Sequence, residues 1–503
     1  MKIISRLAFA ALSVLAAMGF YLVALGVAGL MIYFGYSGLS PFFTNLDSSH
    51  MPIQITAALL VGGAIIVYSL FPRSTKFVPP GLLLDPLKQP ELFAGIQEIA
   101  NATGQAMPKD VYLVPAINAA VTQRGGLAGI GSRRIMLLGL PALQMFSVSE
   151  LKAVLAHEFG HFYAKDTLAG PWVNNSRQAI GRVVQNMPGR WLLSVVKAAF
   201  NWYGLLFLRL TISISRKQEY SADALAARTF GAKYLGQALA KLDAGGPLYV
   251  TFWRQEFAPV LERGFIAPWA EGFSQFCATP SMSAAAESIL VEILEKGKTG
   301  PMDTHPTLRE RLHAMNILEK PAIDFSEASS VSLLNGLKEL EDQLVQFILT
   351  ASKDRKFTPV NWSEVGTRVL LPDWTKRLSS DAAKWQNATI FGLPEMIAAA
   401  DLAEYGRKFA PSNRLPAREE LVEYGAGSFG AALSLALINQ GWTIASMPGC
   451  AVTLFRGDCT FLPFQSIADM KAGTLHADAW RGKCKELEIT DGSLAAAIPA
   501  NPS

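Results

Sequence analysis

Two long apolar runs near the start of the chain predict a pair of membrane-spanning helices. Between Arg6 and Asp47 the sequence has no charged residue, and the run from Leu7 to Phe34 is longer than the about 20 apolar residues that cross a bilayer. A second charge-free run covers Ile53 to Phe71. Basic residues flank the pair and the loop between the runs has none, so the positive-inside bias predicts that both ends face the cytoplasm. A cleaved signal peptide is the alternative, although its apolar core would measure only about 7 to 15 residues.

A third apolar stretch, from Trp191 to Ile214, differs from the first two because Lys197 and Arg209 interrupt it. The stretch before it, from Gly170 to Arg190, is too polar for a span. We therefore expect a helix that is packed within the protein or lies at the membrane interface. A re-entrant element is the alternative.

A helical pattern between these stretches carries the first candidate chemistry. Ser147 and Glu150 have the spacing of a capping box, which predicts where the helix begins. His157 and His161 lie four residues apart, so their Cβ atoms are about 5 to 6 Å apart on one helix face. Two imidazoles so placed can bind one zinc ion, and Glu158 beside them can hold a water molecule that the zinc polarises. A chance match is the alternative, but the chain has only six histidines.

A catalytic zinc needs a third protein ligand, and the best candidate follows the third apolar stretch. Glu219 and Asp223 lie four residues apart among small and apolar residues, where carboxylates are unusual unless they face a cation or a partner. We expect Glu219 to bind the zinc and Asp223 to accept the free ring N–H of a ligand histidine. The stretch between the two ligand helices would then cross the membrane either twice or not at all. The alternative is a solvated helix face that pairs with Arg216 or Arg228.

These motifs, with Asp166 and with Thr304-His305-Pro306 followed by Arg311, resemble the integral-membrane zinc metalloproteases of the HtpX and CAAX-prenyl-endoprotease type. The resemblance covers about residues 80 to 320 and is far more specific than the histidine motif alone. The resemblance implies that His157, His161 and Glu219 are the zinc ligands and that Glu158 is the general base and acid. It also implies that Asp223 supports a ligand from behind and that His305 lies with Arg311 at the substrate end of the cleft. Asp166 and Arg311 are further candidates for a supporting or structural role.

The segment before the motif helix is similar to the same family. Asp110 to Pro115 and then Asn118 to Val121 correspond to the strand pair that precedes the active helix. Family members usually carry an aromatic residue after the Asn-Ala pair, whereas this chain has Ala120, so we expect a different side-chain pocket there. A substrate would pair as an extended strand with a sheet edge. The candidate edges are Asn118, Ala119, Ala120 and Val121, continuing to Thr122, or else Arg134 to Leu138.

His305 has a chemical reason to be functional. Attack of water on a peptide carbonyl creates an oxyanion, and one positioned hydrogen-bond donor stabilises it by about 3 kcal/mol. We expect His305 to be such a donor. Arg311 fits a structural role equally well, as the partner of a carboxylate near the site.

Composition limits the other possibilities. The 503 residues carry a net charge of +4 and are 50% hydrophobic, which indicates neither a disordered chain nor a nucleic-acid-binding protein. The four cysteines, Cys277, Cys450, Cys459 and Cys484, have no zinc-binding spacing, and the cytoplasm would keep them reduced.

The last part of the chain, from about residue 326, lies outside the resemblance and predicts a helical and then an α+β module. Ala426 to Ile438 is an apolar helix and Trp442 to Ser446 a strand. A hairpin turns at Arg456-Gly457-Asp458, and a helix from Asp478 to Leu487 follows. We expect this module to bind an unknown protein partner.

The sequence thus predicts a mainly α-helical chain with a small β-sheet and three parts. These are a transmembrane helical hairpin in residues 1–77, a gluzincin-type metalloprotease domain in residues 78–325 and the accessory module in residues 326–503. We expect a zinc endopeptidase with one zinc per chain, anchored in a plasma or bacterial inner membrane, that cleaves misfolded or membrane proteins at the cytoplasmic face. A prenyl-peptide endoprotease is one alternative. A non-catalytic membrane scaffold, with structural zinc and a partner on the C-terminal module, is the other.

Overall fold

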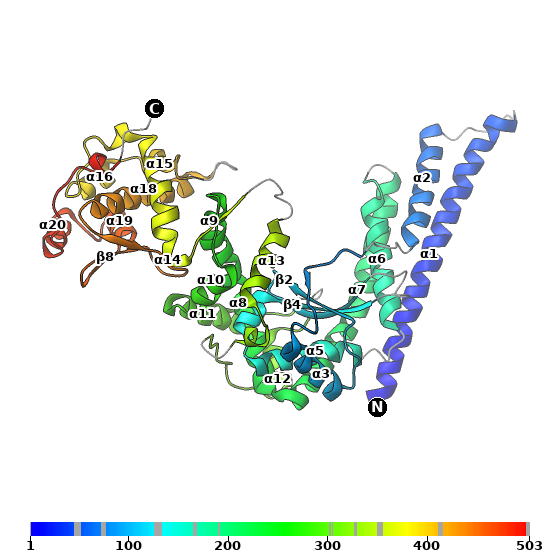
Figure 1. Cartoon of the computed structure of the whole chain (residues 1–503). Helices are drawn as coiled ribbons and strands as arrows, with labels where there is room; N and C mark the ends of the chain where they lie inside the picture. The colour runs from blue at the N-terminus through cyan, green and yellow to red at the C-terminus, as the bar shows by residue number, and fades with distance from the viewer. Residues whose placement is uncertain are drawn as a thin grey trace. The chain divides into compact units, whose positions relative to one another are not determined.

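The computed structural model describes the chain except for residues 1, 45–51, 72–76, 125–132, 164–168, 190–191, 301–302, 304, 326–328, 350–355, 411–415 and 499–503. Its contacts form two compact units (Figure 1). The first contains Met1–Gly245 and Glu287–Leu337, and the second contains Gly246–Ala286 and Lys338–Ser503. The chain is mainly helical with small sheets, as the sequence predicts. The division at residues 77 and 325 stays a prediction.

Four helices of the first unit pack around one apolar core. They are α1 (Lys2–Thr44), α2 (Ile53–Leu70), α6 (Ala169–Asn186) and α7 (Leu192–Ala226). Helices α1 and α2 approach closely at a glycine: a Cβ on Gly63 would lie 3.0 Å from the Ala28 carbonyl oxygen. Large apolar side chains remain exposed along both helices, which is typical of a surface that contacts lipid. The predicted pair of apolar N-terminal helices is confirmed.

The third apolar stretch belongs to α7 and is packed within this bundle. The Tyr203 hydroxyl donates a hydrogen bond to the Ala16 carbonyl of α1 at 2.6 Å. Arg177 of α6 donates through Nε to the Thr211 hydroxyl of α7 at 3.1 Å. Among the described residues, four helical runs are long and apolar enough to cross a membrane: α1, α2, the run that begins with α7, and α18 (Arg418–Ile438). Most of α18 is buried in the second unit.

A four-stranded sheet of the first unit determines which strand can meet a substrate. Its strands are β1 (Leu82–Leu83), β2 (Asp110–Val114), β3 (Ala119–Arg124) and β4 (Arg133–Gly139), in the order β1-β2-β4-β3. Strand β4 pairs with β2 in parallel and with β3 in antiparallel fashion, so β3 is an edge strand. The predicted alternative edge at Arg134 to Leu138 is wrong, because β4 has a partner on both sides.

Helix α5 (Val148–Tyr163) follows the sheet and carries the histidine motif. The capping box forms as predicted: the Ser147 N–H donates to the Glu150 carboxylate at 2.8 Å. Lys241 Nζ lies 2.9 Å from the same carboxylate in a buried ion pair. The other helices of this unit are α3 (Pro90–Thr103), α4 (Leu140–Met145) and α12 (Leu308–Ala314). Helix α8 (Ala232–Phe252) runs from the first unit into the second, and α11 (Pro280–Lys296) runs from the second back into the first.

The second unit combines helices with two small sheets. Its remaining helices are α9 (Ala258–Glu262), α10 (Trp269–Ala278), α13 (Leu337–Leu349), α14 (Trp362–Val365), α15 (Leu371–Ser379), α16 (Leu393–Ala399), α17 (Leu402–Gly406), α19 (Pro463–Lys471) and α20 (Ala477–Glu486). Its strands are β5 (Phe265–Ile266) and β6 (Thr358–Pro359) in one sheet, and β7 (Thr443–Ala445), β8 (Thr453–Arg456) and β9 (Cys459–Phe461) in the other. The predicted strand, hairpin and last helix are confirmed as β7, β8–β9 and α20.

Candidate active site

Helix α5 presents three metal-capable side chains on one side. His157, Glu158 and His161 each offer a ligand atom, and these atoms lie within 4.8 Å of one another. The two imidazole rings are 4.7 Å apart, centroid to centroid, and nearly perpendicular. Among the residues that the structure describes, these three form the group that could hold a metal ion.

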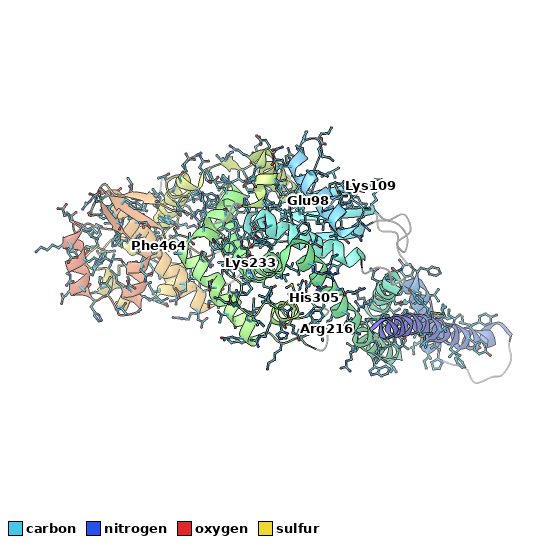
Figure 2. All side chains as sticks on the ribbon, turned by 90° about the horizontal axis from the view of Figure 1, so that it is seen from below. Glu98, Lys109, Arg216, Lys233, His305 and Phe464 are labelled. Atoms are coloured by element: carbon cyan, nitrogen blue, oxygen red, sulfur yellow. The ribbon has the colours of Figure 1, made fainter. Side chains whose placement is uncertain are left out.

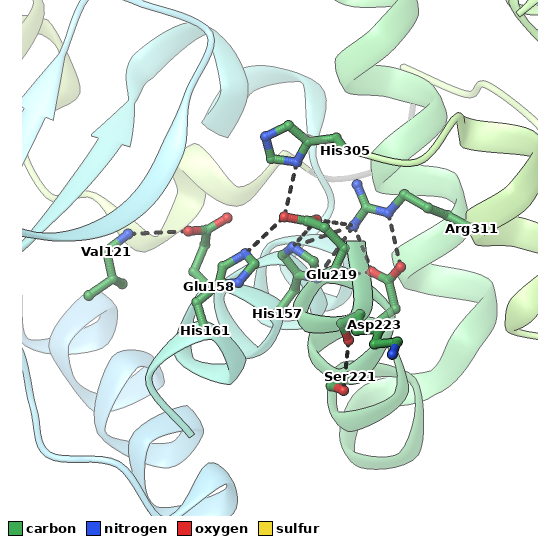
Figure 3. A network of polar contacts seen from close by, with 10 residues as sticks. Val121, His157, Glu158, His161, Glu219, Ser221, Asp223, His305 and Arg311 are labelled. Atoms are coloured by element: carbon green, nitrogen blue, oxygen red, sulfur yellow. Dashed lines mark hydrogen bonds and ion pairs between the residues drawn. The ribbon is translucent and has the colours of Figure 1, made fainter. Parts of the chain in front are cut away.

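Helix α7 brings carboxylates to this group because it packs closely on α5. A Cβ on Gly160 would lie only 2.8 Å from the Ala222 Cα, so glycine at this position lets the two helices touch. Glu219 Oε2 then lies 3.5 Å from His157 Nε2, and Glu219 Oε1 lies 3.7 Å from His161 Nε2. Gly160, inside the histidine motif, therefore explains how Glu219, the third ligand candidate, reaches His157 and His161 (Figure 3).

The spacing of these donor atoms fits a zinc ion. Zinc–nitrogen and zinc–oxygen bonds of about 2.0 to 2.1 Å place two tetrahedral ligands about 3.3 Å apart. The separations of Glu219 from His157 and His161 are close to this value. Two imidazoles and one carboxylate are also a donor set that zinc prefers, with a fourth position left for water.

Asp223 and Arg311 support one of the histidines from behind. His157 Nδ1 lies 2.9 Å from Asp223 Oδ1, which directs Nε2 of the same ring toward Glu219. Arg311 of α12 donates to both oxygens of Asp223, at 2.9 and 2.6 Å. The side chains of Glu219 and Asp223 are only 6% and 1% exposed, so the alternative of a solvated helix face is wrong.

His305 reaches the site from the segment before α12. Its Nδ1 lies 2.9 Å from Glu219 Oε1, and 69% of its side chain is exposed. The hydrogen bond to Glu219 raises the pKa of His305. The other ring nitrogen is therefore available to a group that enters from solvent. Asp166 falls outside the described residues.

Glu158 faces the edge strand. Its Oε2 accepts a hydrogen bond from the Val121 backbone N–H at 3.4 Å, so the outer edge of β3 points at the site. Burial raises the pKa of the Glu158 carboxyl group. A raised pKa suits a carboxylate that must first take and then return a proton.

The two histidines have opposite electrostatic surroundings. Burial disfavours the charged form of His157, but hydrogen bonds with Asp223 and Glu219 outweigh burial and raise its pKa to about 9. Burial, together with the neighbouring His157, lowers the pKa of His161 to about 4. The carboxylates that favour a proton on His157 would equally favour a metal cation in its place.

One residue near the site, Arg216, has a role that the sequence did not predict. Its position in the sequence indicated only a surface ion pair with the acids of α7. In the structure it bonds instead to the segment that carries His305. Its position three residues before Glu219, on the same helix face, is the signal that pointed to it.

Comparison with known proteins identifies relatives of this chain. Residues 86–319 match the model of Peptidase family M48. A protease HtpX homolog from Acaryochloris marina is 32% identical over 36% of this chain and 64% of its own length, so this match covers less than two thirds of that relative. A protease HtpX homolog from Aeropyrum pernix is 28% identical over 61% of this chain and 96% of its own length.

Protease HtpX of Klebsiella pneumoniae is 28% identical over 41% of this chain and 78% of that protein. Among solved structures, the crystal structure of S. mikatae Ste24p matches 58% of this chain and 63% of that chain, with 17% identity and a TM-score of 0.27. The family match covers both ligand helices, the edge strand and the His305 segment. Residues 86–319 of this chain are therefore similar to Peptidase family M48, and the chain is similar to the HtpX proteases over part of its length.

Proposed function

We propose that this protein is a membrane-anchored, zinc-dependent endopeptidase. One observation carries the proposal: the two carboxylate oxygens of Glu219 lie 3.5 Å from His157 Nε2 and 3.7 Å from His161 Nε2, near the spacing of tetrahedral zinc ligands. Glu158 is also one of the metal-capable side chains of α5, and we assign it proton transfer rather than zinc binding. The direct test gives an unfolded protein such as casein to the detergent-solubilised chain and compares the chain with Glu158→Gln.

Each residue of the site has a defined task in peptide hydrolysis. Bound at the three ligands, zinc would lower the pKa of a water molecule and polarise the scissile carbonyl. Glu158 takes a proton from the attacking water, through the oxygen that Val121 does not bind. The protonated Glu158 then delivers the proton to the departing amine. His305 donates a ring N–H to the oxyanion, while Asp223 holds the His157 ring in place.

The edge strand β3 supports a substrate preference that depends little on sequence. Because the Val121 N–H points out of the sheet toward Glu158, a substrate strand can pair with the backbone of Asn118 to Val121 beside the catalytic carboxylate. Main-chain pairing suits a quality-control protease that cleaves misfolded or membrane proteins. The exposed apolar helices would hold the enzyme in the same bilayer as such substrates.

A scaffold with structural zinc is less consistent with the site. Structural zinc sites usually close with four protein ligands and favour cysteine. All four cysteines belong to the second unit, whereas the ligand residues belong to the first. The second unit is itself a well-packed module, and binding of a protein partner is the role that we propose for it.

Replacement of Asp223 by asparagine should lower zinc affinity or activity by about 10- to 100-fold. Asparagine keeps the shape but loses the charge that orients His157 and pairs with Arg311. Zinc competition with a chromophoric chelator measures the affinity, and casein cleavage measures the activity. Wild-type values for both would reduce Asp223 to a residue without a role in the site.

The topology proposal can be tested by cysteine labelling in a chain whose native cysteines are replaced. Glu98 and Lys217 are exposed; Glu98 precedes α6, and Lys217 follows the apolar stretch within α7. Cysteines at both positions should react with a membrane-impermeant maleimide from the cytoplasmic side, because the proposed ligands before and after this apolar stretch share the site. A cysteine at Ser48 should react from the opposite side. Labelling of positions 98 and 217 from different faces would contradict a shared zinc.

A further inference from the structure

Side chains on one face of α7 bond to residues in α12 and in the segment that leads into it. Arg216, Glu219 and Asp223 have the spacing i, i+3 and i+7, so they form one stripe along the helix. Glu219 bonds to His305 and Asp223 bonds to Arg311. Arg216 makes the third connection, one helical turn before Glu219, and no task in catalysis or zinc binding accounts for it.

Arg216 binds two backbone carbonyl oxygens of a single turn. Its Nη2 donates to the Gly300 carbonyl at 2.6 Å and its Nε donates to the Asp303 carbonyl at 3.1 Å. The turn is also closed within itself: the Asp303 N–H donates to the Gly300 carbonyl at 3.2 Å, and the Gly300 N–H donates to the Asp303 carboxylate at 2.6 Å. Arg216 therefore fixes a preformed turn against α7, two residues before His305.

The other end of the segment is fixed independently. The Thr307 N–H donates to the Glu310 carboxylate at 2.9 Å, and the Glu310 N–H returns a bond to the Thr307 hydroxyl in a capping box. The Thr299 hydroxyl bonds to the same Glu310 carboxylate. His305 thus lies between a helix cap on one side and the Arg216 contact on the other. Its side chain is largely exposed, so these two attachments determine its place over Glu219.

We propose that Arg216 is a positioning residue that holds His305 at the zinc site by clamping the Gly300–Asp303 turn onto α7. Figure 2 labels both side chains, which lie near each other in the first unit. The inference rests on the proposed function, because it gives His305 a catalytic task. The bonds of Thr299 with Glu310 and Thr307 tie the Gly300 end of the segment to the cap of α12, whereas Arg216 ties it to α7. Removal of the clamp therefore frees this end from α7, and the His305 ring loses its alignment over Glu219.

The planar guanidinium group, whose N–H groups point in fixed directions, explains why this position is an arginine. Two carbonyl oxygens from residues three apart are bound by two N–H groups of one planar group. The single ammonium group of a lysine is a point donor and cannot reproduce both directions. Arg216→Lys should therefore restore only part of the function that Arg216→Ala loses.

The test compares five forms of the full-length chain in detergent: wild type, Arg216→Ala, His305→Ala, the double variant and the control Arg309→Ala. Arg309 is exposed on α12. Its replacement by alanine removes the same positive charge as Arg216→Ala without touching the turn. We expect Arg216→Ala to lower kcat for casein cleavage by about 10- to 100-fold with KM and zinc content unchanged, as for a misplaced catalytic group. The double variant should be no slower than His305→Ala, because Arg216 acts through His305.

A second readout does not depend on activity. In chelated protein, hydrogen exchange over residues 297–307 should be faster in Arg216→Ala than in wild type or Arg309→Ala. Effects of Arg216→Ala and His305→Ala that multiply in the double variant would overturn the proposal, as would unchanged exchange or unchanged kcat. If Arg216→Ala does not fold, Arg216→Lys carries the same comparison. Absence of casein cleavage by the wild-type protein would refute the endopeptidase proposal. The hydrogen-exchange comparison would then test the Arg216 contact by itself.

Discussion

Glu158→Gln should abolish most of the casein cleavage, with a fall of about 100- to 10,000-fold, while the zinc content stays at the wild-type level. Glutamine has the same shape as glutamate and still accepts the hydrogen bond that the Val121 N–H now donates to Glu158. It cannot take a proton from water at neutral pH. The three proposed ligands are unchanged, so the metal should remain. Cleavage rates and zinc per chain, measured on the same preparation, give both quantities.

The matched control is Glu98→Gln, which removes a carboxylate that pairs with Lys152 at the protein surface. Exposed ion pairs contribute little to stability, so this variant should cleave casein at the wild-type rate. Cleavage that persists in Glu158→Gln would contradict the mechanism. Equal loss in both variants would indicate a general effect of replacing a carboxylate by an amide.

Glu219→Ala should release zinc and eliminate cleavage together. Its carboxylate supplies the third ligand atom, and its removal leaves two imidazoles with a gap on the α7 side. The loss of zinc affinity should exceed the about 10- to 100-fold that follows from removal of a partner outside the ligand set. Dialysis against a weak chelator, followed by metal analysis, measures the retained zinc.

Ser221→Ala is the control on the same helix. The Ser221 hydroxyl is exposed and donates to the Lys217 carbonyl of its own helix, so its removal should leave zinc and activity unchanged (Figure 3). Full zinc content in Glu219→Ala after dialysis would place the third ligand elsewhere. It would also remove the main reason to join α5 and α7 in one metal site.

The spacing of His157 and His161 was sufficient to predict that they share a helix face, because a helix brings residues i and i+4 together whatever surrounds them. Glu219 was predictable for a different reason. A carboxylate among small apolar residues must face a partner, and the structure buries it against both histidines. Local helix geometry and the cost of burying charge thus account for most of the candidate site.

Long-range pairing was not predictable in the same way. The continuous apolar run within Arg134 to Leu138 indicates a strand but not its neighbours, and β4 proved to be an inner strand rather than an edge. The contact between Arg216 and the Gly300–Asp303 turn joins residues that are more than 80 positions apart. Sequence spacing places Arg216 on the helix face of Glu219, but it does not identify the distant segment that Arg216 contacts.

The most direct test of the zinc endopeptidase proposal measures zinc per chain and casein cleavage in parallel for wild type, Glu158→Gln and Glu219→Ala. We predict about one zinc with cleavage in wild type, about one zinc without cleavage in Glu158→Gln, and neither in Glu219→Ala. Casein cleavage at the wild-type rate by Glu158→Gln, or by a Glu219→Ala protein that holds no zinc, would contradict the proposal.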